Sequence, residues 1–227
     1  MSVFLEILEL AGIGLVTLLP LTNPLSTVAV FLSLSAELSP KERTKQIKLT
    51  CIYVFCIMMV AFYGGQLIMN FFGISIPGLR IAGGMIVSLI GFRMLFPQPA
   101  TPKIAQKQEP EIIGAEPEAN FAFVPLAMPI TAGPGTIAMI ISNAASVKSG
   151  LFSITSPISA QIAPVITFLL LTVILAFCLR SSTTLMQKIG TRGLDAITRI
   201  MGFLLICMGT QFIINGIVEI VQKGAYS

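Results

Sequence analysis

The segments PLTNPLSTVAVFLS (residues 20–33) and PITAGPGTIAMIIS (residues 129–142) decide the fold that we predict for this chain. They align without a gap at an offset of 109 residues (129 − 20), with prolines, threonines, alanines and serines at matching positions. Both lie inside long apolar stretches, where proline and glycine remove helical hydrogen bonds and favour a break. The sequence therefore predicts two helices that are interrupted inside a membrane.

The composition of the chain indicates a membrane protein. Its 227 residues are 55% hydrophobic and 11% charged, with a mean hydropathy of +0.91, whereas a soluble domain carries about 25% charged residues. Only helices and closed barrels can span lipid, because every backbone polar group must be paired there. The apolar runs are continuous and lack the alternating pattern of barrel strands. The predicted class is therefore an all-α membrane protein.

Six stretches are long enough to be membrane spans, since a helical crossing needs about 20 apolar residues. The first is too long for one straight crossing and holds Pro20, Asn23 and Pro24, while the fourth holds Pro129 and Pro134. We therefore expect spans one and four to be discontinuous helices. The six predicted transmembrane helices cover residues 4–35, 49–72, 75–96, 121–146, 161–180 and 198–222.

The lysines and arginines predict how the chain is oriented in the membrane. Eleven of them fall on one side of the six-span arrangement and three on the other, and the positive-inside rule places the richer side in the cytoplasm. Both termini are then predicted to be periplasmic. The eleven are Lys41, Arg43, Lys45, Lys48, Arg93, Lys103, Lys107, Arg180, Lys188, Arg192 and Arg199, and the three are Arg80, Lys148 and Lys223.

A polar segment, residues 97–120, divides the chain into two halves. It is rich in proline, glutamate and glutamine, a composition typical of disorder, and we predict a mobile cytoplasmic linker between residues 1–96 and residues 121–227. A second match supports this division, because RIAG at residues 80–83 aligns with RIMG at residues 199–202, at an offset of 119 (199 − 80). A ten-residue insertion between the two matches would reconcile the offsets.

An odd number of spans in each half places the second half upside down relative to the first. Three spans per half predict two inverted three-helix repeats, an architecture that recurs in secondary transporters with the substrate site at the broken helices. The alternative is that the prolines are ordinary kinks and that the similarity between the halves is chance.

Glycines inside the spans are expected to lie where helices meet. The pairs Gly64-Gly65 and Gly83-Gly84, together with Gly202 and Gly209, fall in apolar stretches. Small residues let helices in lipid approach closely, because no hydrophobic drive acts between them. We interpret these glycines as packing positions.

The two breaks supply groups that suit a small zwitterion. A broken helix exposes N–H groups at the start of its second part and carbonyl groups at the end of its first, so an amino acid could be held without a charged side chain. For any one hydroxyl, the alternative is a hydrogen bond back to its own helix. We predict substrate binding by Thr22, Asn23, Ser26, Thr27, Thr131, Gly133, Gly135 and Thr136, around structural helix breaks at Pro20, Pro24, Pro129 and Pro134.

Charged side chains are predicted only near the ends of the spans. Arg80 and Arg199 stand at the starts of spans three and six and are interpreted as snorkelling anchors, with binding of a gate carbonyl or a substrate carboxylate as the alternative. Glu6, Glu9 and Glu219 are candidates for an outer gate or an interface. No carboxylate is predicted at the centre of a span, which leaves coupling to Na⁺ or to H⁺ open.

Several classes of protein are not expected. The chain has no histidine, and its four cysteines lie in apolar runs without a CxxC pair, so we predict no metal site and no cofactor. No Ser/His or Cys/His set is available for catalysis, so an enzyme is not expected. The basic residues lie in loops, which argues against nucleic-acid binding. The expected partners are the lipid bilayer, a small-molecule substrate and, as an open option, further copies in a homo-oligomer.

Four segments carry a resemblance to a known family: NPLSTVAVFLSLS, FGISIPGLRIAGGMIVSLIGFRMLFPQ, FVPLAMPITAGPGTIAMIIS and RIMGFLLICMGTQFIINGI. They closely resemble the MarC family of integral membrane proteins, also called UPF0056, over nearly the whole chain. The resemblance implies a bacterial inner-membrane protein with six spans. It also implies transport as a function, because part of the family moves small neutral amino acids such as glycine and alanine.

The family motifs coincide with the predicted breaks. The resulting hypothesis is a secondary transporter for a small neutral amino acid or similar zwitterion, with export as one direction. The alternatives are efflux of toxic compounds with a role in antibiotic response, and a non-transporting scaffold or sensor partner. Pro20, Asn23 and Pro24 stand in the family's NP element, and Thr131, Gly133, Pro134, Gly135 and Thr136 stand in its TAGPGT element.

Overall fold

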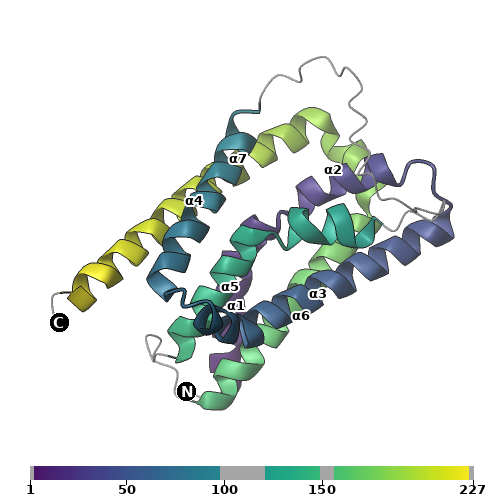
Figure 1. Ribbon diagram of the computed structural model, residues 1–227. Helices are drawn as coiled ribbons and strands as arrows, with labels where there is room; N and C mark the ends of the chain where they lie inside the picture. Colours follow the sequence, from purple (N-terminus) through teal and green to yellow (C-terminus); the bar gives the residue numbers. More distant parts are fainter. Residues whose placement is uncertain (1–2, 98–120, 149–155, 225–227) are drawn as a thin grey trace.

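The computed structural model describes residues 3–97, 121–148 and 156–224, and in these ranges all regular secondary structure is helical (Figure 1). The predicted linker, residues 97–120, lies outside the described residues apart from its first residue. In chain order the elements are α1 (Val3–Thr22), α2 (Pro24–Leu34), α3 (Pro40–Phe71), α4 (Ile76–Leu95), the π-helix η1 (Ala122–Thr131), α5 (Pro134–Lys148), α6 (Pro157–Arg180) and α7 (Ser182–Gly224).

The lengths and surfaces of these helices confirm an all-α membrane fold. Helices α1, α3, α4, α6 and the Arg192–Gln222 part of α7 are each long and apolar enough to cross a bilayer, and the bent pair η1 and α5 makes a sixth candidate if it is one span. Large apolar side chains such as Val16, Leu67 and Phe71 are exposed on the helix sides, where lipid would cover them. The described helices thus supply five or six of the six predicted crossings.

Two helices start earlier than hydropathy predicts. Helix α3 begins at Pro40 rather than at residue 49, because Ser39 and Glu42 form a reciprocal cap in which each side chain accepts a hydrogen bond from the other's backbone N–H. Helix α7 begins at Ser182 rather than at residue 198 and is kinked at Gly190, whose φ of 68° favours glycine. Hydropathy detects the lipid-facing part of a helix and misses its polar turns.

Both predicted interruptions are present. Asn23 separates α1 from α2 in the left-handed region (φ 35°), which asparagine tolerates better than most residues. Pro24 follows and has no N–H with which to continue the hydrogen bonding of α1, whereas Pro20 lies inside α1 and does not end it. Element η1 contains Pro125 and Pro129 and departs from helical φ/ψ at Val124 and Met128, the residues directly before these prolines. Between η1 and α5 the helix axis bends by 61°. Each break leaves backbone groups without helical partners.

Helices α4 and α7 form a closely packed antiparallel pair (Figure 1). A Cβ atom built on Gly84 would lie 2.5 Å from the carbonyl oxygen of Gly209, and one built on Gly91 would lie 2.6 Å from that of Gly202. Both distances are far inside van der Waals contact, so only glycine fits at these positions. This packing confirms the role predicted for Gly84, Gly202 and Gly209. The same prediction was wrong for Gly64, where a Cβ atom would meet only Val60 of its own helix, at 3.9 Å.

The other helices form a second group around a buried core. Helix α6 contacts both α1 and α3, and α3 also contacts η1 and α5. Phe31 of α2, Met58 of α3, Leu126 of η1 and Leu171 of α6 are fully buried in one apolar cluster. Helix α5 contacts α4 as well as α3. The broken helices therefore lie between the α4–α7 pair and the rest of the bundle.

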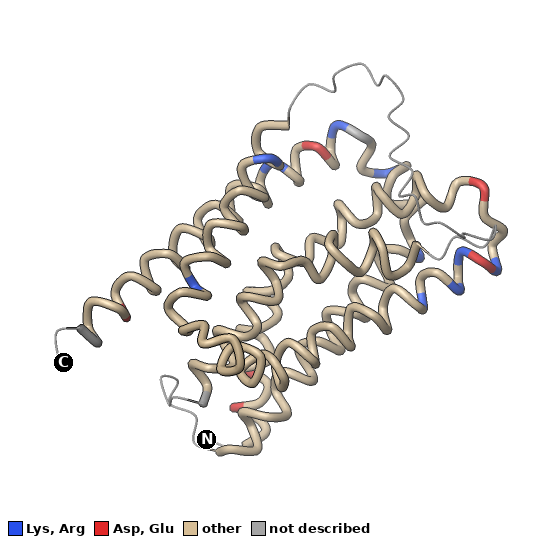
Figure 2. The backbone as a smooth tube through the Cα atoms, in the orientation of Figure 1, with Lys and Arg blue, Asp and Glu red and all other residues tan. Residues whose placement is uncertain are grey.

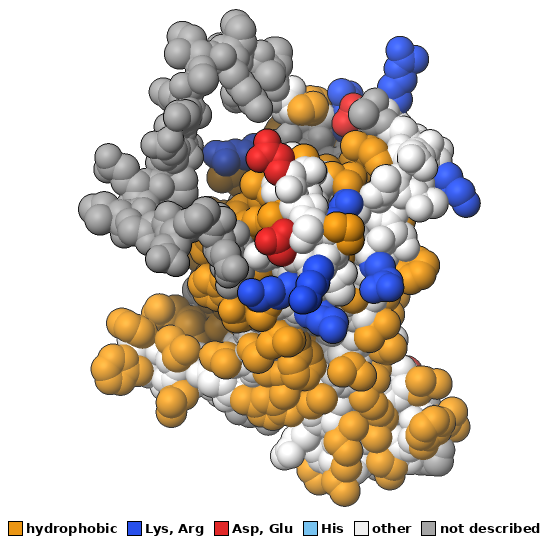
Figure 3. Space-filling view, turned by 90° about the vertical axis from the view of Figure 1, so that its right-hand side faces the viewer, with side chains coloured by type: hydrophobic (Ala, Val, Ile, Leu, Met, Phe, Trp, Pro, Cys, Tyr) orange, Lys and Arg blue, Asp and Glu red, His pale blue; other side chains and the backbone are white. Residues whose placement is uncertain are grey.

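The charged side chains distinguish two ends of the bundle. Figure 2 shows the lysines and arginines concentrated at one end, and Figure 3 shows a mainly hydrophobic surface beyond them. The two chain termini lie at the opposite end (Figure 1). These are termed the basic end and the terminal end. The assignment of the basic end to the cytoplasm stays a prediction.

One added methyl group at Gly84 is expected to loosen the α4–α7 pair. In Gly84→Ala the new Cβ meets the Gly209 carbonyl, and this clash outweighs the gain of about 1 kcal/mol that alanine brings to a helix interior. We expect the melting temperature of the purified protein in detergent to fall by several degrees. The matched control is Gly64→Ala, because the nearest neighbour of that new Cβ is Val60 at 3.9 Å. Equal melting temperatures for the two variants would contradict this packing.

Candidate functional site

A cavity lies between the two helix breaks. Its volume is about 350 Å³, within the range of about 300–1,000 Å³ typical of small-molecule sites. Both breaks contribute to its lining, and α4 and α7 close the opposite side. The lining residues are Leu21, Asn23 and Ser26 from the first break, Pro129, Ile130, Gly133, Pro134, Gly135 and Thr136 from the second, Val87, Ile90 and Met94 from α4, and Leu205 from α7.

At the first break, Asn23 caps α2 with its side chain. Its Oδ1 accepts a hydrogen bond from the Ser26 backbone N–H (3.3 Å), and its Nδ2 donates to Ser26 Oγ (2.7 Å). The same Nδ2 lies 3.8 Å from Met94 Sδ on α4. Asn23 is only 7% exposed, and a buried amide is costly unless it is paired. Its polar groups therefore hold the break in shape and connect it to α4.

At the second break, α5 follows directly on Gly133. Pro134 is its first residue and has no N–H, and the Gly133 carbonyl accepts from Ile137 N at 3.0 Å. The first N–H groups of a helix have no partner within it, and Gly133 has no side chain to supply one. Gly135 and Thr136, in the first turn of α5, line the cavity, where the start of a helix carries partial positive charge.

The glycines of the second break allow close approach of neighbouring groups. A Cβ atom on Gly133 would collide with the Pro129 carbonyl oxygen. One on Gly135 would lie 2.7 Å from Val87 Cγ2 of α4. Any side chain at either position would push α5 away from its neighbours.

The two breaks are joined directly by a hydrogen bond. The hydroxyl oxygens of Thr27 and Thr131 lie 3.1 Å apart, and both residues are buried. Each hydroxyl also lies within hydrogen-bond distance of a carbonyl of its own segment, Thr27 of Asn23 (3.3 Å) and Thr131 of Leu126 (2.9 Å). Because a hydroxyl has one proton, one threonine donates to its carbonyl while the other donates across the link. The interrupted helices therefore meet inside the protein, each through a residue next to its own break.

The structure separates the eight predicted binding residues into two sets. Thr22 hydrogen bonds to the carbonyls of Leu18 and Leu19 in its own helix, and Thr27 and Thr131 form the link between the breaks. Thr136 lines the cavity, and its hydroxyl has no hydrogen-bond partner within the described part of the chain. The five that line the cavity are Asn23, Ser26, Gly133, Gly135 and Thr136.

The α4 side of the cavity was missed by reasoning from the sequence. Val87, Ile90 and Met94 are ordinary apolar residues in an apolar span. Their spacing of three and four places them on one helix face, which is the only sequence signal that they share. Nothing in a single sequence says that this face, rather than another, covers the breaks.

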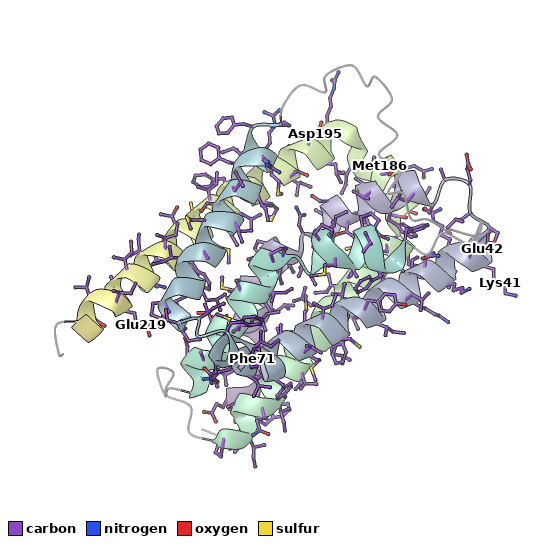
Figure 4. The ribbon with its side chains drawn as sticks, in the orientation of Figure 1. Lys41, Glu42, Phe71, Met186, Asp195 and Glu219 are labelled. Atoms are coloured by element: carbon purple, nitrogen blue, oxygen red, sulfur yellow. The ribbon has the colours of Figure 1, made fainter. Side chains whose placement is uncertain are left out.

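A second polar cluster surrounds Arg80, between α4, α5 and α7. The guanidinium donates to Ser142 Oγ (2.6 Å), to Ser146 Oγ and to the carboxylate of Glu219 (2.7 Å). Glu219 lies in the terminal-end part of α7 (Figure 4). Protein groups thus hold the head group of Arg80, and its assignment as a gate or as an anchor stays a prediction. Arg199, its counterpart in the second half, is exposed.

Comparison with known proteins identifies the family. Residues 8–221 match the family described as MarC family integral membrane protein. The chain belongs to the MarC family. Two relatives, both named UPF0056 inner membrane protein MarC, come from Salmonella typhimurium and Escherichia coli. Each is 56% identical over 219 residues, which cover 96% of this chain and 98% of the relative. No solved structure matches the chain.

This MarC-family chain has a second cavity, of about 110 Å³, between α1, α5 and α6. Its lining is mostly apolar, with Phe62 and Phe168 among the larger side chains. The hydroxyl of Thr167, which also lines it, donates to the Ala163 carbonyl of its own helix. This cavity lacks the helix ends of the first, and we do not assign the substrate to it.

Substitution of Asn23 tests whether the first break is held as described. Asn23→Gly keeps access to positive φ and loses only the side-chain cap, so the free energy of unfolding should fall by less than about 1 kcal/mol. Asn23→Ala loses the cap and also places an L-side chain at positive φ, so the fall should reach about 2 kcal/mol or more. Unfolding in mixed micelles would measure both. An alanine variant as stable as the glycine variant would contradict the left-handed conformation.

Proposed function

We propose that this chain is a secondary transporter for a small neutral amino acid or similar zwitterion, in the bacterial inner membrane for which its relatives are named. The observation that carries the proposal is the cavity between the helix breaks, where the start of α5 and the end of η1 line one volume. Secondary transporters bind substrates at discontinuous helices in this way. The proposal includes no catalytic step, no metal and no cofactor.

The start of α5 supplies a place for the carboxylate group. Gly135 and Thr136 line the cavity in the first turn of α5, and their N–H groups and the Thr136 hydroxyl are the donors that we assign to the carboxylate. The N-terminus of α2, capped by Asn23, reaches the same cavity through Ser26. Two helix N-termini directed at one volume make it electropositive without a cationic side chain. Such a site suits an anionic group on a molecule of low net charge.

The ends of α1 and η1 supply a place for the ammonium group. Leu21 at the end of α1, and Pro129 and Ile130 near the end of η1, line the cavity. The last carbonyls of a helix have no intrahelical donor and carry partial negative charge. Carbonyl oxygens of this kind also coordinate Na⁺ in transporters. The proposal therefore leaves the coupling ion open between Na⁺ and H⁺.

The remaining wall explains the preference for a neutral side chain. Val87, Ile90, Met94 and Leu205 present apolar groups, and among the described residues no Asp, Glu, Lys or Arg lines the cavity. A charged substrate side chain would lose its hydration there without gaining a partner. An apolar or small side chain carries no such cost.

The arrangement of the two halves supports alternating access. We propose that residues 1–96 and 121–227 are inverted repeats, each with one broken helix and one helix of the α4–α7 pair. In such folds one bundle rocks against the other around a fixed site. If the basic end is cytoplasmic, the cavity beside it receives substrate from the cell interior, and export is the proposed direction.

Exchange of labelled amino acids in proteoliposomes tests the proposal. We expect the purified protein to exchange labelled alanine or glycine, while neutral drugs neither move nor compete. Drug movement without amino-acid exchange would favour the efflux alternative. Folded protein that moves neither class of compound would favour a scaffold or sensor role.

Two threonine variants show whether the cavity itself binds the substrate. Thr136→Val removes a hydroxyl that has no hydrogen-bond partner among the described residues. It should raise the KM for alanine roughly tenfold, since a hydrogen bond to a charged group contributes about 1.5–3 kcal/mol. Thr22→Val is the matched control, because its hydroxyl bonds only to its own helix. Its KM should stay near that of the wild type. Equal effects of the two substitutions would place the substrate elsewhere.

A further inference from the structure

The Arg80 cluster closes the terminal end between α5 and the α4–α7 pair. Arg80 of α4 binds Ser142 and Ser146 of α5 and also Glu219 of α7. Its side chain is 13% exposed, and that of Glu219 is 22% exposed. These contacts fasten the second broken helix to both members of the pair. The cluster is therefore a clamp, and in this structure it is closed.

The repeat supplies a counterpart for this clamp at the basic end. Arg80 corresponds to Arg199, and Ser142 corresponds to Ser33, in the two sequence matches between the halves. Arg199 is exposed on α7, and Ser33 is exposed on α2, where its hydroxyl donates to the Val30 carbonyl of its own helix. Within the described ranges no hydrogen bond joins the two. The second clamp is therefore open.

The position of the cavity agrees with one closed and one open clamp. Along α4 its lining runs from Val87 to Met94, and α4 leads from Arg80 near its start to the basic end. The seven-residue step from Val87 to Met94 corresponds to a helical rise of about 10 Å. The cavity extends over this distance along α4, on the side away from the closed clamp. It does not include Arg80, Ser142 or Glu219. The cavity therefore lies on the basic-end side of the closed clamp.

We propose that Arg80 with Ser142, and Arg199 with Ser33, are alternative clamps, and that transport exchanges one for the other. The structure is the state in which the terminal end is clamped. The opposite state would break the Arg80–Ser142 contact and form the Arg199–Ser33 contact, so that access moves to the terminal end. The purpose assigned to the two clamps rests on the proposed transport function. The contacts themselves do not, and they can be tested without substrate.

The experiment measures one distance across the basic end in four proteins. Spin labels at Leu34 of α2 and Ile200 of α7, both exposed, report that distance by double electron–electron resonance in nanodiscs, in a background in which the four native cysteines are replaced. Ser142→Ala weakens the closed clamp, and Ser33→Ala removes the matching serine of the open one. Arg199→Gln removes the other partner of the open clamp.

Opposite shifts from matched serine variants are the expected result. Ser142→Ala should raise the ratio of short to long distances roughly tenfold, because it removes a hydrogen bond to a charged group. Ser33→Ala and Arg199→Gln should lower the same ratio. Both serine variants carry the same substitution, from serine to alanine. A general loss of packing would therefore shift the distance ratio in the same direction in both variants, whereas the clamps predict opposite directions.

The experiment distinguishes failure of the clamp proposal from failure of the proposed amino-acid substrate. Unchanged distances in all variants, or shifts of the same sign, would overturn the proposal even if alanine exchange is intact. Opposite shifts in a protein that moves no amino acid would uphold the clamps and reject the cargo. Ser33→Ala and Arg199→Gln are expected to lower the same distance ratio. If one of these two variants fails to fold in nanodiscs, the other still tests the clamp at the basic end.

Discussion

The hydrogen bond between Thr27 and Thr131 holds together the feature on which the rest of the structure depends. Lipid supplies no hydrogen bonds, so an interrupted helix is tolerated only where protein groups or a polar cavity satisfy its backbone. Thr27 and Thr131 bring the two interruptions to one place, 3.1 Å apart at their hydroxyls. Each break then helps to shield the other, and the groups left over face a shared cavity.

The α4–α7 pair provides the fixed wall against which this arrangement forms. Its glycine contacts bring two backbones closer than any side chain would allow, which makes the pair a compact unit. Met94 contacts the first break through Asn23, and Val87 contacts the second through Gly135. One helix face therefore sets the position of both breaks, while Arg80 secures the far part of α5. Packing, cavity and clamp are consequences of the same close approach.

Much of the fold could be predicted from residue types whose effect is local. Proline, glycine and asparagine act on their own backbone, so the breaks near Asn23 and Gly133 were visible in the sequence, as were the glycines that pack α4 against α7. Hydropathy located the spans but misjudged the starts of α3 and α7, since the capped, polar turns at Pro40 and Ser182 carry no apolar signal.

The candidate site was harder to predict because its composition depends on distant parts of the chain. Thr22, Thr27 and Thr136 look alike in the sequence, yet one bonds to its own helix, one joins the breaks and one is left facing the cavity. Val87 carried only the helical spacing that it shares with Ile90 and Met94, which does not say what that face covers. The partners of Arg80 were not predicted, because Ser142, Ser146 and Glu219 lie more than sixty residues away in the sequence.

A structure determined with saturating alanine tests the central claim most directly, namely that the two breaks bind a zwitterion through their backbone groups. The account predicts ligand density in the cavity between the breaks, with the carboxylate about 2.7–3.2 Å from the N–H groups of Gly135 and Thr136. Density in the apolar cavity between α1, α5 and α6, or an empty cavity at saturating alanine in a protein that transports it, would contradict the account.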